Sequence, residues 1–202
     1  MTFCLTTTIL KPEKNMPIKS AVILLHGYGG SGKDISILAL NWKRFLPNTV
    51  FLCPNGYEKC AINPTGYQWF DLTRDDPEYI LEQSKKCEIK LRQFIEEIKN
   101  EYILKNSQIC LSGFSQGCMM SINLGLISSE NYNCIVGFSG KIINQEDLIK
   151  RKTSSTKMLL IHGDKDEIVL PNFLLEAKDF LIRNDIEIET KMIKNCEHHI
   201  PV

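Results

Sequence analysis

The sequence predicts an α/β fold with a mostly parallel central sheet that carries helices on both faces. Short apolar runs that end in turn residues alternate with longer helix-like segments along the 202 residues. Most of these runs lack period-two alternation, as expected for strands that are buried on both faces. Strands separated by helices favour a parallel sheet. No repeat, low-complexity tract or long linker divides residues 1–202, so a single domain is expected.

Each helix or strand is predicted from the pattern of apolar and turn residues within its own segment. The strands are apolar runs such as AVILLH, TVFLC and QICLS, and they cover residues 21–26, 49–53, 108–112, 134–138, 158–162 and 186–192. Helix-like segments lie between them at residues 33–45, 77–103, 115–128, 145–151 and 171–183. In open sheets of this kind, function gathers at the carboxyl ends of the strands, where loops meet helix N-termini.

Composition argues against several classes of function. Lys plus Arg and Asp plus Glu both total 24, so the formal net charge is zero and no broad field favours nucleic acid or an anionic membrane. The eight cysteines show no CxxC pair or metal-ligand spacing, which predicts buried free thiols and no metal site. No apolar segment approaches the roughly 20 residues that span a bilayer, and the N-terminus lacks a signal-peptide pattern. We therefore expect a cytoplasmic location without stable membrane insertion.

Ser115 is the predicted nucleophile. It lies in the pentapeptide GFSQG, directly after the strand-like QICLS and directly before a helix-like segment. G-x-S-x-G in this context places a serine on a sharp turn, and the flanking glycines avoid collisions with the neighbouring strand and helix. The helix N-terminus also directs backbone N–H groups at a developing oxyanion. The N–H of Gln116 is expected to be one donor.

An acid and a base should follow the nucleophile in the order Asp or Glu, then His. Just past the strand at residues 158–162 stand three acids: Asp164, Asp166 and Glu167. Acids at such junctions also cap turns and helices. We interpret Asp164 as a turn residue, keep it as the reserve acid, and choose Asp166 as the catalytic one.

Only four histidines are present, and two of them, His198 and His199, follow the last predicted strand. That is where the order of a triad requires the base, and His198 is preferred over His199. His26 and His162 each precede a glycine at a strand end. They are interpreted as residues that shape loops.

The glycine-rich loop after the first predicted strand has two interpretations. Residues 26–33 read HGYGGSGK, a turn whose backbone can approach a ligand closely, and the N–H of Tyr28 is a candidate second oxyanion donor. The run from Gly27 to Lys33 also matches the first seven positions of the phosphate-binding pattern G-x-x-x-x-G-K-[ST]. Position eight is Asp34, which puts a carboxylate where that pattern needs a hydroxyl for magnesium. The oxyanion interpretation is therefore favoured over nucleotide binding.

Together, the segments LLHGYGG, WFDL, LSGFSQG, IHGDKDEIV and EHH resemble the phospholipase/carboxylesterase family, which includes acyl-protein thioesterases and small bacterial carboxylesterases. The resemblance extends over nearly the whole chain, and GFSQG is its most specific part. It implies the α/β-hydrolase fold and a triad of Ser115, Asp166 and His198. It also implies an oxyanion hole formed by the backbone N–H groups of Tyr28 and Gln116.

By the same resemblance, the segment that contains Trp69 and Phe70 lines the acyl side of the site, with ordinary core packing as the alternative. The implied activity is hydrolysis of small carboxylic esters or thioesters, acylated proteins included, through an acyl-enzyme and without a cofactor. Two alternatives remain: a degenerate hydrolase that binds without turnover, and a nucleotide-binding protein.

The family normally continues into a final helix after the catalytic histidine, whereas Val202 follows His198 by four residues. The resemblance therefore predicts a sheet that lacks this helix and has an uncovered apolar face. We hypothesise that a second copy covers this face in a homodimer, or that the chain is a shortened, weakly folded product.

Overall fold

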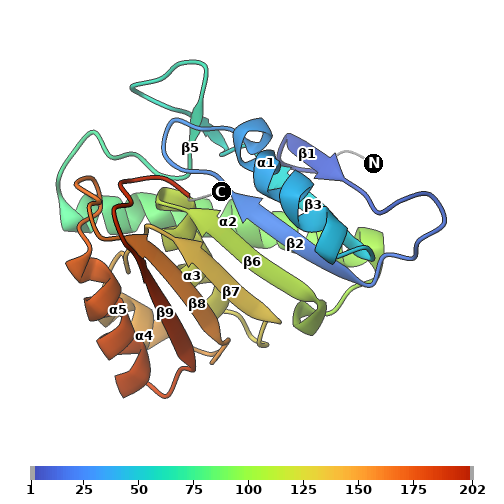
Figure 1. Cartoon of the computed structure of the whole chain (residues 1–202). Coiled ribbons are helices and arrows are strands. Elements are labelled where there is room, and N and C mark those ends of the chain that lie inside the picture. The colour runs from blue at the N-terminus through green and yellow to red at the C-terminus, as the bar shows by residue number, and fades with distance from the viewer. Residues whose placement is uncertain (1–2, 201–202) are drawn as a thin grey trace.

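A seven-stranded sheet forms the centre of the computed structural model, which describes residues 3–200 (Figure 1). Its strand order is β1-β3-β2-β6-β7-β8-β9. Strand β1 (Thr7–Leu10) pairs antiparallel with β3, and the remaining neighbours pair in parallel. The parallel strands are β2 (Ser20–Leu25), β3 (Thr49–Pro54), β6 (Ile109–Phe114), β7 (Cys134–Phe138), β8 (Met158–Gly163) and β9 (Ile188–Ile193). The strand order changes direction beside β2, so a crevice is expected at the carboxyl ends of β2 and β6.

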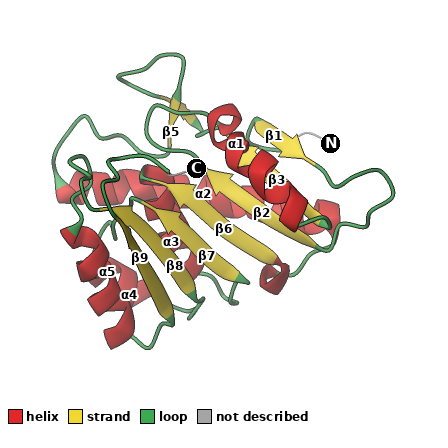
Figure 2. Cartoon of the chain, viewed as in Figure 1, coloured by secondary structure: helices red, strands yellow, loops and turns green. Residues whose placement is uncertain are grey.

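Helices cover both faces of this sheet (Figure 2). Helix α1 (Gly32–Trp42) lies on one face and α2 (Pro77–Tyr102), α3 (Gln116–Leu126), α4 (Gln145–Arg151) and α5 (Asn172–Arg183) lie on the other. Short 3₁₀ turns follow α1 (Lys43–Phe45) and precede β6 (Asn106–Gln108), and strands β4 (Glu58–Lys59) and β5 (Tyr67–Gln68) form a separate hairpin. The predicted fold class is confirmed.

Alternating side chains of the buried strands supply two apolar cores. In β2, for example, Val22 and Leu24 pack toward α1, whereas Ile23 and Leu25 join the larger core beneath α2 and α3. This two-sided burial explains why the strands read as continuous apolar runs. It also holds the carboxyl ends of β2 and β6 in register, with Leu25 opposite Gly113 at the point where the two glycine motifs begin.

The predicted elements correspond to observed ones, and no end differs by more than two residues when the 3₁₀ turn after α1 is counted with that helix. Strand β1 and the β4-β5 hairpin were not predicted. Strand β1 lies at the sheet edge, and its TTIL sequence is only partly buried, so it lacks the long apolar run of the central strands. The single domain, the missing final helix, the homodimer and the cytoplasmic location stay predictions.

The prediction of uniformly buried cysteines is wrong in part. All eight are free thiols, but Cys4 is exposed and Cys110 and Cys134 are only half-buried. The latter two are opposed on β6 and β7, on the sheet face that α1 covers only in part. Among residues 3–200, no three or more His, Cys, Asp and Glu side chains are grouped so that they could hold a metal ion. No helix in the same range combines the length and the apolar character needed to cross a membrane.

Candidate active site

A sharp turn between β6 and α3 presents Ser115. The serine has φ 53°, a left-handed backbone conformation that non-glycine residues rarely adopt. Its N–H donates to the Phe138 carbonyl at 2.8 Å, which ties the turn to β7. A Cβ on Gly113 would lie 2.3 Å from the Gly117 carbonyl carbon, and a Cβ on Gly117 would lie 2.1 Å from the Leu25 oxygen. Both glycines of GFSQG are therefore required by close backbone packing, as the motif predicts.

A continuous chain of hydrogen bonds joins three of the predicted residues. The Ser115 hydroxyl lies 3.0 Å from His198 Nε2, and His198 Nδ1 lies 2.7 Å from Asp166 Oδ2. The other carboxylate oxygen, Asp166 Oδ1, accepts the N–H groups of Ile168 at 3.0 Å and Val169 at 2.8 Å. These partners assign the His198 proton to Nδ1 and leave Nε2 as an acceptor.

The environment keeps Asp166 ionised. Its side chain is fully buried, and burial acts to raise the pKa of a carboxyl group. Hydrogen bonds from His198 and from the Val169 N–H outweigh burial, so the pKa of Asp166 lies below its ordinary value. A second histidine, His162, is buried beside it, with Nε2 3.3 Å from Asp166 Oδ2 and 2.7 Å from the Val169 oxygen.

The two reserve residues lie elsewhere. Asp164 is exposed, in the turn after β8, where its N–H donates to the Ile193 carbonyl. His199 is also exposed, and its Nε2 lies 3.8 Å from Cys196 Sγ. Neither residue forms a hydrogen bond with Ser115, so the structure brings together the preferred acid and base.

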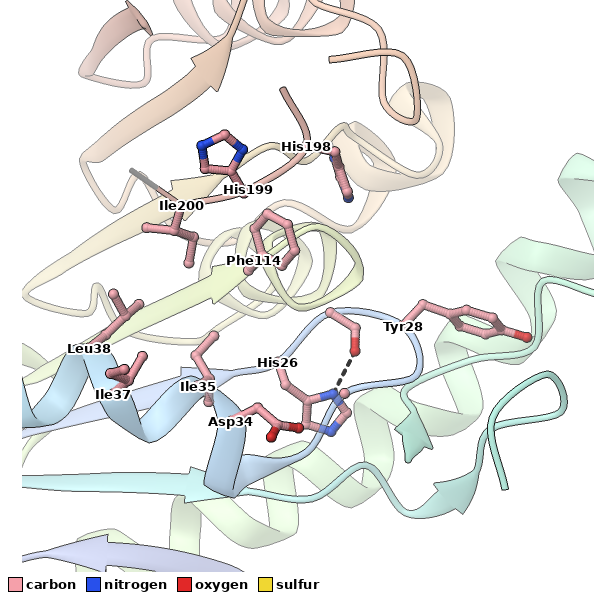
Figure 3. A pocket seen from close by; sticks show the side chains of 12 residues that line it. His26, Tyr28, Asp34, Ile35, Ile37, Leu38, Phe114, His198, His199 and Ile200 are labelled. Carbon is pink, nitrogen blue, oxygen red and sulfur yellow. Dashed lines mark hydrogen bonds between the residues drawn. The ribbon is translucent and has the colours of Figure 1, made fainter. Parts of the chain in front are cut away.

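The glycine-rich loop is held by His26. Gly56 N–H donates to His26 Nε2 at 2.9 Å, which assigns the ring proton to Nδ1. His26 Nδ1 then donates to the Gly27 carbonyl at 2.7 Å (Figure 3). Gly30 N–H donates to the same oxygen at 3.0 Å. Burial lowers the pKa of His26, so the ring stays neutral. Because a trans peptide sets its N–H opposite its carbonyl, two donors on Gly27 O fix the direction of the Tyr28 N–H.

Gln116 connects this loop to the nucleophile. Its side-chain oxygen accepts the Trp69 N–H at 2.8 Å, and its amide nitrogen donates to the Phe70 carbonyl at 2.6 Å. The Trp69 indole donates in turn to the His26 carbonyl at 2.8 Å. Trp69 is fully buried and lines none of the hollows beside Ser115, which favours core packing for this residue. Phe70 does line a hollow beside Ser115.

Two hollows meet at the hydrogen-bonded chain. The larger one, about 570 Å³, contains Ser115 and Gln116, and its apolar wall comes from Phe70, Leu72, Ile80, Met119, Ile143, Ile168 and Val169. The smaller one, about 330 Å³, lies on the α1 side (Figure 3). The four residues that line both hollows are Gly27, Tyr28, Phe114 and His198. The smaller hollow was not predicted, although the apolar run ISILAL in α1 is wider than the single stripe that one buried helix face requires.

The loop from Gly27 to Lys33 is not arranged to hold a phosphate. Its Gly29, Gly30 and Gly32 N–H groups donate to Tyr67 O, Gly27 O and Asn55 Oδ1 respectively. Ser31 caps α1 by accepting the Asp34 N–H, and its hydroxyl donates to the Asp34 carboxylate at 2.7 Å. A phosphate-binding loop needs such N–H groups free, so the structure disfavours nucleotide binding.

Comparisons with known proteins identify the family. The sequence profile described as phospholipase/carboxylesterase matches residues 8–202. Acyl-protein thioesterase 1 of Emericella nidulans is 30% identical over 173 residues, 76% of this chain and 72% of the relative. Acyl-protein thioesterase 1 of Yarrowia lipolytica is 26% identical over 207 residues, 93% of this chain and 86% of the relative. The crystal structure of esterase PE8, 34% identical, has a TM-score of 0.93 and covers 98% of this chain and 92% of its own. The chain therefore belongs to the phospholipase/carboxylesterase family and is a hydrolase.

Proposed function

We propose that this hydrolase cleaves carboxylic esters and thioesters with Ser115 as nucleophile, His198 as general base and Asp166 as the acid that orients the base. The observation that supports this most directly is the unbroken chain from Ser115 Oγ through His198 to Asp166, at 3.0 and 2.7 Å. A serine hydroxyl becomes a useful nucleophile only when an imidazole within hydrogen-bond reach accepts its proton.

The reaction follows from these positions. His198 Nε2 takes the Ser115 proton as Oγ attacks the carbonyl carbon, and Asp166 stabilises the imidazolium that forms. The imidazolium returns the proton to the leaving oxygen or sulphur, which leaves an acyl-enzyme. Water, deprotonated by His198, then attacks the acyl carbon and restores the Ser115 hydroxyl. The backbone N–H groups of Tyr28 and Gln116 are the proposed donors to the oxyanion of both tetrahedral intermediates.

The larger hollow is the proposed site for the acyl group. It contains Ser115 Oγ, to which the acyl carbon becomes bonded, and its wall of Phe70, Met119, Ile143 and other apolar side chains suits a hydrocarbon chain. Arg74 and Lys141 also line it. The relatives named as acyl-protein thioesterases and as an esterase support both thioesters and esters as substrates, small molecules and acylated proteins included.

A fluorophosphonate probe tests this proposal directly. Such a probe phosphonylates an activated serine, so one equivalent is expected to attach to the wild-type chain and to map to Ser115 by peptide mass spectrometry. Ser115→Ala should abolish the labelling, while Ser129→Ala, which changes an exposed serine after α3, should not. A folded wild type that neither reacts with the probe nor hydrolyses p-nitrophenyl esters would instead be a degenerate hydrolase that only binds.

His26 provides a test of the proposed oxyanion hole. His26→Phe keeps a ring of similar shape but removes the donor to Gly27 O, so the Tyr28 N–H loses one of the two contacts that fix its direction. We expect kcat for p-nitrophenyl acetate to fall about 10- to 100-fold, less than the full loss of an oxyanion donor. Trp69→Phe is the matched control, because it removes a hydrogen bond to His26 O but leaves Gly27 O fully held. Wild-type kcat in a folded His26→Phe variant would contradict this role.

A further inference from the structure

The smaller hollow touches the proposed base but not the proposed nucleophile. Gly27, Tyr28, Phe114 and His198 line both hollows and form their boundary, whereas Ser115 lines only the larger hollow. Its opposite wall is Ile35, Ile37 and Leu38 of α1 (Figure 3). Ile35 and Leu38 are buried, whereas Ile37 is 57% exposed. The hollow is therefore an apolar groove with an open rim, and it begins at His198.

The acyl group and the leaving group of a substrate are expected to extend to different sides of this boundary. The acyl carbon becomes bonded to Ser115 Oγ, so the acyl chain belongs to the hollow that contains Ser115. The leaving oxygen or sulphur must instead receive a proton from His198 Nε2. A substituent on that atom can extend into the hollow that His198 lines and Ser115 does not.

We propose that the smaller hollow binds the apolar part of the alcohol or thiol leaving group, so that the preferred substrates carry apolar groups on both sides of the scissile bond. This assignment rests on the proposed function of Ser115, Asp166 and His198. The chemical class that fits the hollow is a neutral alkyl or aryl alcohol or thiol.

Charge in the hollow agrees with a leaving group that is not anionic. Asp34 is the carboxylate in the lining. The Ser31 hydroxyl donates a hydrogen bond to this carboxylate, which keeps it at the N-terminus of α1. The neutral ring of His26 provides no opposite charge beside it. No Lys or Arg is among the described residues that line this hollow, so an anionic leaving group would meet Asp34 without a permanent cation beside it.

Two isomeric esters separate the hollows. Hexyl acetate and ethyl hexanoate have the same formula, but the first places four additional methylenes on the leaving group and the second places them on the acyl group. Ethyl acetate is the common reference, so each variant is judged by its kcat/KM ratios and not by its absolute rate. In wild type we expect both ratios to exceed about tenfold, because each buried methylene contributes to binding.

Aspartate substitutions in each hollow show which hollow is responsible for each kcat/KM ratio. Ile37→Asp is expected to lower the hexyl acetate ratio at least about fivefold and to preserve the ethyl hexanoate ratio. Ile143→Asp, in the larger hollow, should have the opposite selectivity. Leu175→Asp changes an exposed leucine of α5 that lines neither hollow, and both of its ratios should equal those of wild type.

The outcomes are distinct. A wild type that hydrolyses ethyl acetate but gains nothing from hexyl acetate overturns the leaving-group assignment and leaves the proposed function intact. Equal losses of both ratios in Ile37→Asp also overturn it. If none of the three esters is hydrolysed and the fluorophosphonate probe does not react, the proposed function fails and this inference fails with it.

Discussion

Alanine in place of His198 is expected to lower kcat for p-nitrophenyl acetate by about 10⁴- to 10⁶-fold, as removal of a triad base does in serine hydrolases. His198 Nε2 is the nitrogen 3.0 Å from the Ser115 hydroxyl, and without it that hydroxyl keeps its proton. The side chain is partly exposed, so its loss should change the melting temperature little. Initial rates and thermal unfolding measured on the same preparation separate the two effects.

The neighbouring residue is the matched control for this result. His199 has the same side chain, is exposed, and has its ring beside Cys196 Sγ rather than Ser115. His199 also lines the smaller hollow, so the comparison uses ethyl acetate, which carries a short leaving group, and on this ester His199→Ala should retain kcat within about fivefold. Combining Ser115→Ala with His198→Ala should cost little more than either change alone, because the two residues act on one proton transfer. A large loss in His199→Ala with activity retained in His198→Ala would exchange their roles.

The central part of the fold could be predicted because its signals are local and strong. Strands β2, β3, β6, β7 and β8 are largely buried runs with turn residues at their ends, and the helices α1 to α4 lie between them. Strand β1 was not predicted because it has few apolar residues and depends on pairing with β3, more than forty positions away in the chain. Its existence is decided by that partner and not by its own sequence.

The same division holds at the site. Ser115 could be predicted because GFSQG carries its own geometric requirement, a turn so tight that Gly113 and Gly117 must lack side chains. The choice of Asp166 over Asp164 depended on interpreting Asp164 as a turn residue, although both are acids after a strand. The structure separates them by burial and by the two N–H groups that hold Asp166, and local sequence does not encode those contacts.

The hollows were the least predictable feature. Each is enclosed by segments far apart in the chain, such as α1 and the residues around His198, so its shape depends on how those segments pack. The hydrogen bonds that join His26, Trp69 and Gln116 also connect residues far apart in the chain. A motif therefore indicates which chemistry is present, while packing decides which substrate reaches it.

Asp166→Asn is expected to lower kcat by about 10⁴-fold although it changes one atom, because the structure determines how the new amide must point. Oδ1 of Asp166 accepts two N–H groups, from Ile168 and Val169, and only an oxygen can occupy that position. The asparagine NH₂ must then take the place of Oδ2, 2.7 Å from His198 Nδ1. A donor at that place forces Nδ1 to accept, which moves the His198 proton to Nε2. His198 would then donate to Ser115 Oγ instead of accepting its proton.

The alternative explanation, a damaged fold, predicts a different pattern. Since asparagine keeps the acceptor for both backbone N–H groups, Asp166→Asn should fold and melt close to wild type at neutral pH while kcat is lost. Asp164→Asn is the control, since the same atom changes on an exposed acid two residues away, and its kcat should stay within about twofold of wild type. If Asp166→Asn retained activity while Asp164→Asn lost it, the orienting acid would be Asp164. If both variants were fully active, neither Asp166 nor Asp164 would orient His198, because the 2.7 Å contact with Asp166 would then contribute nothing to the reaction.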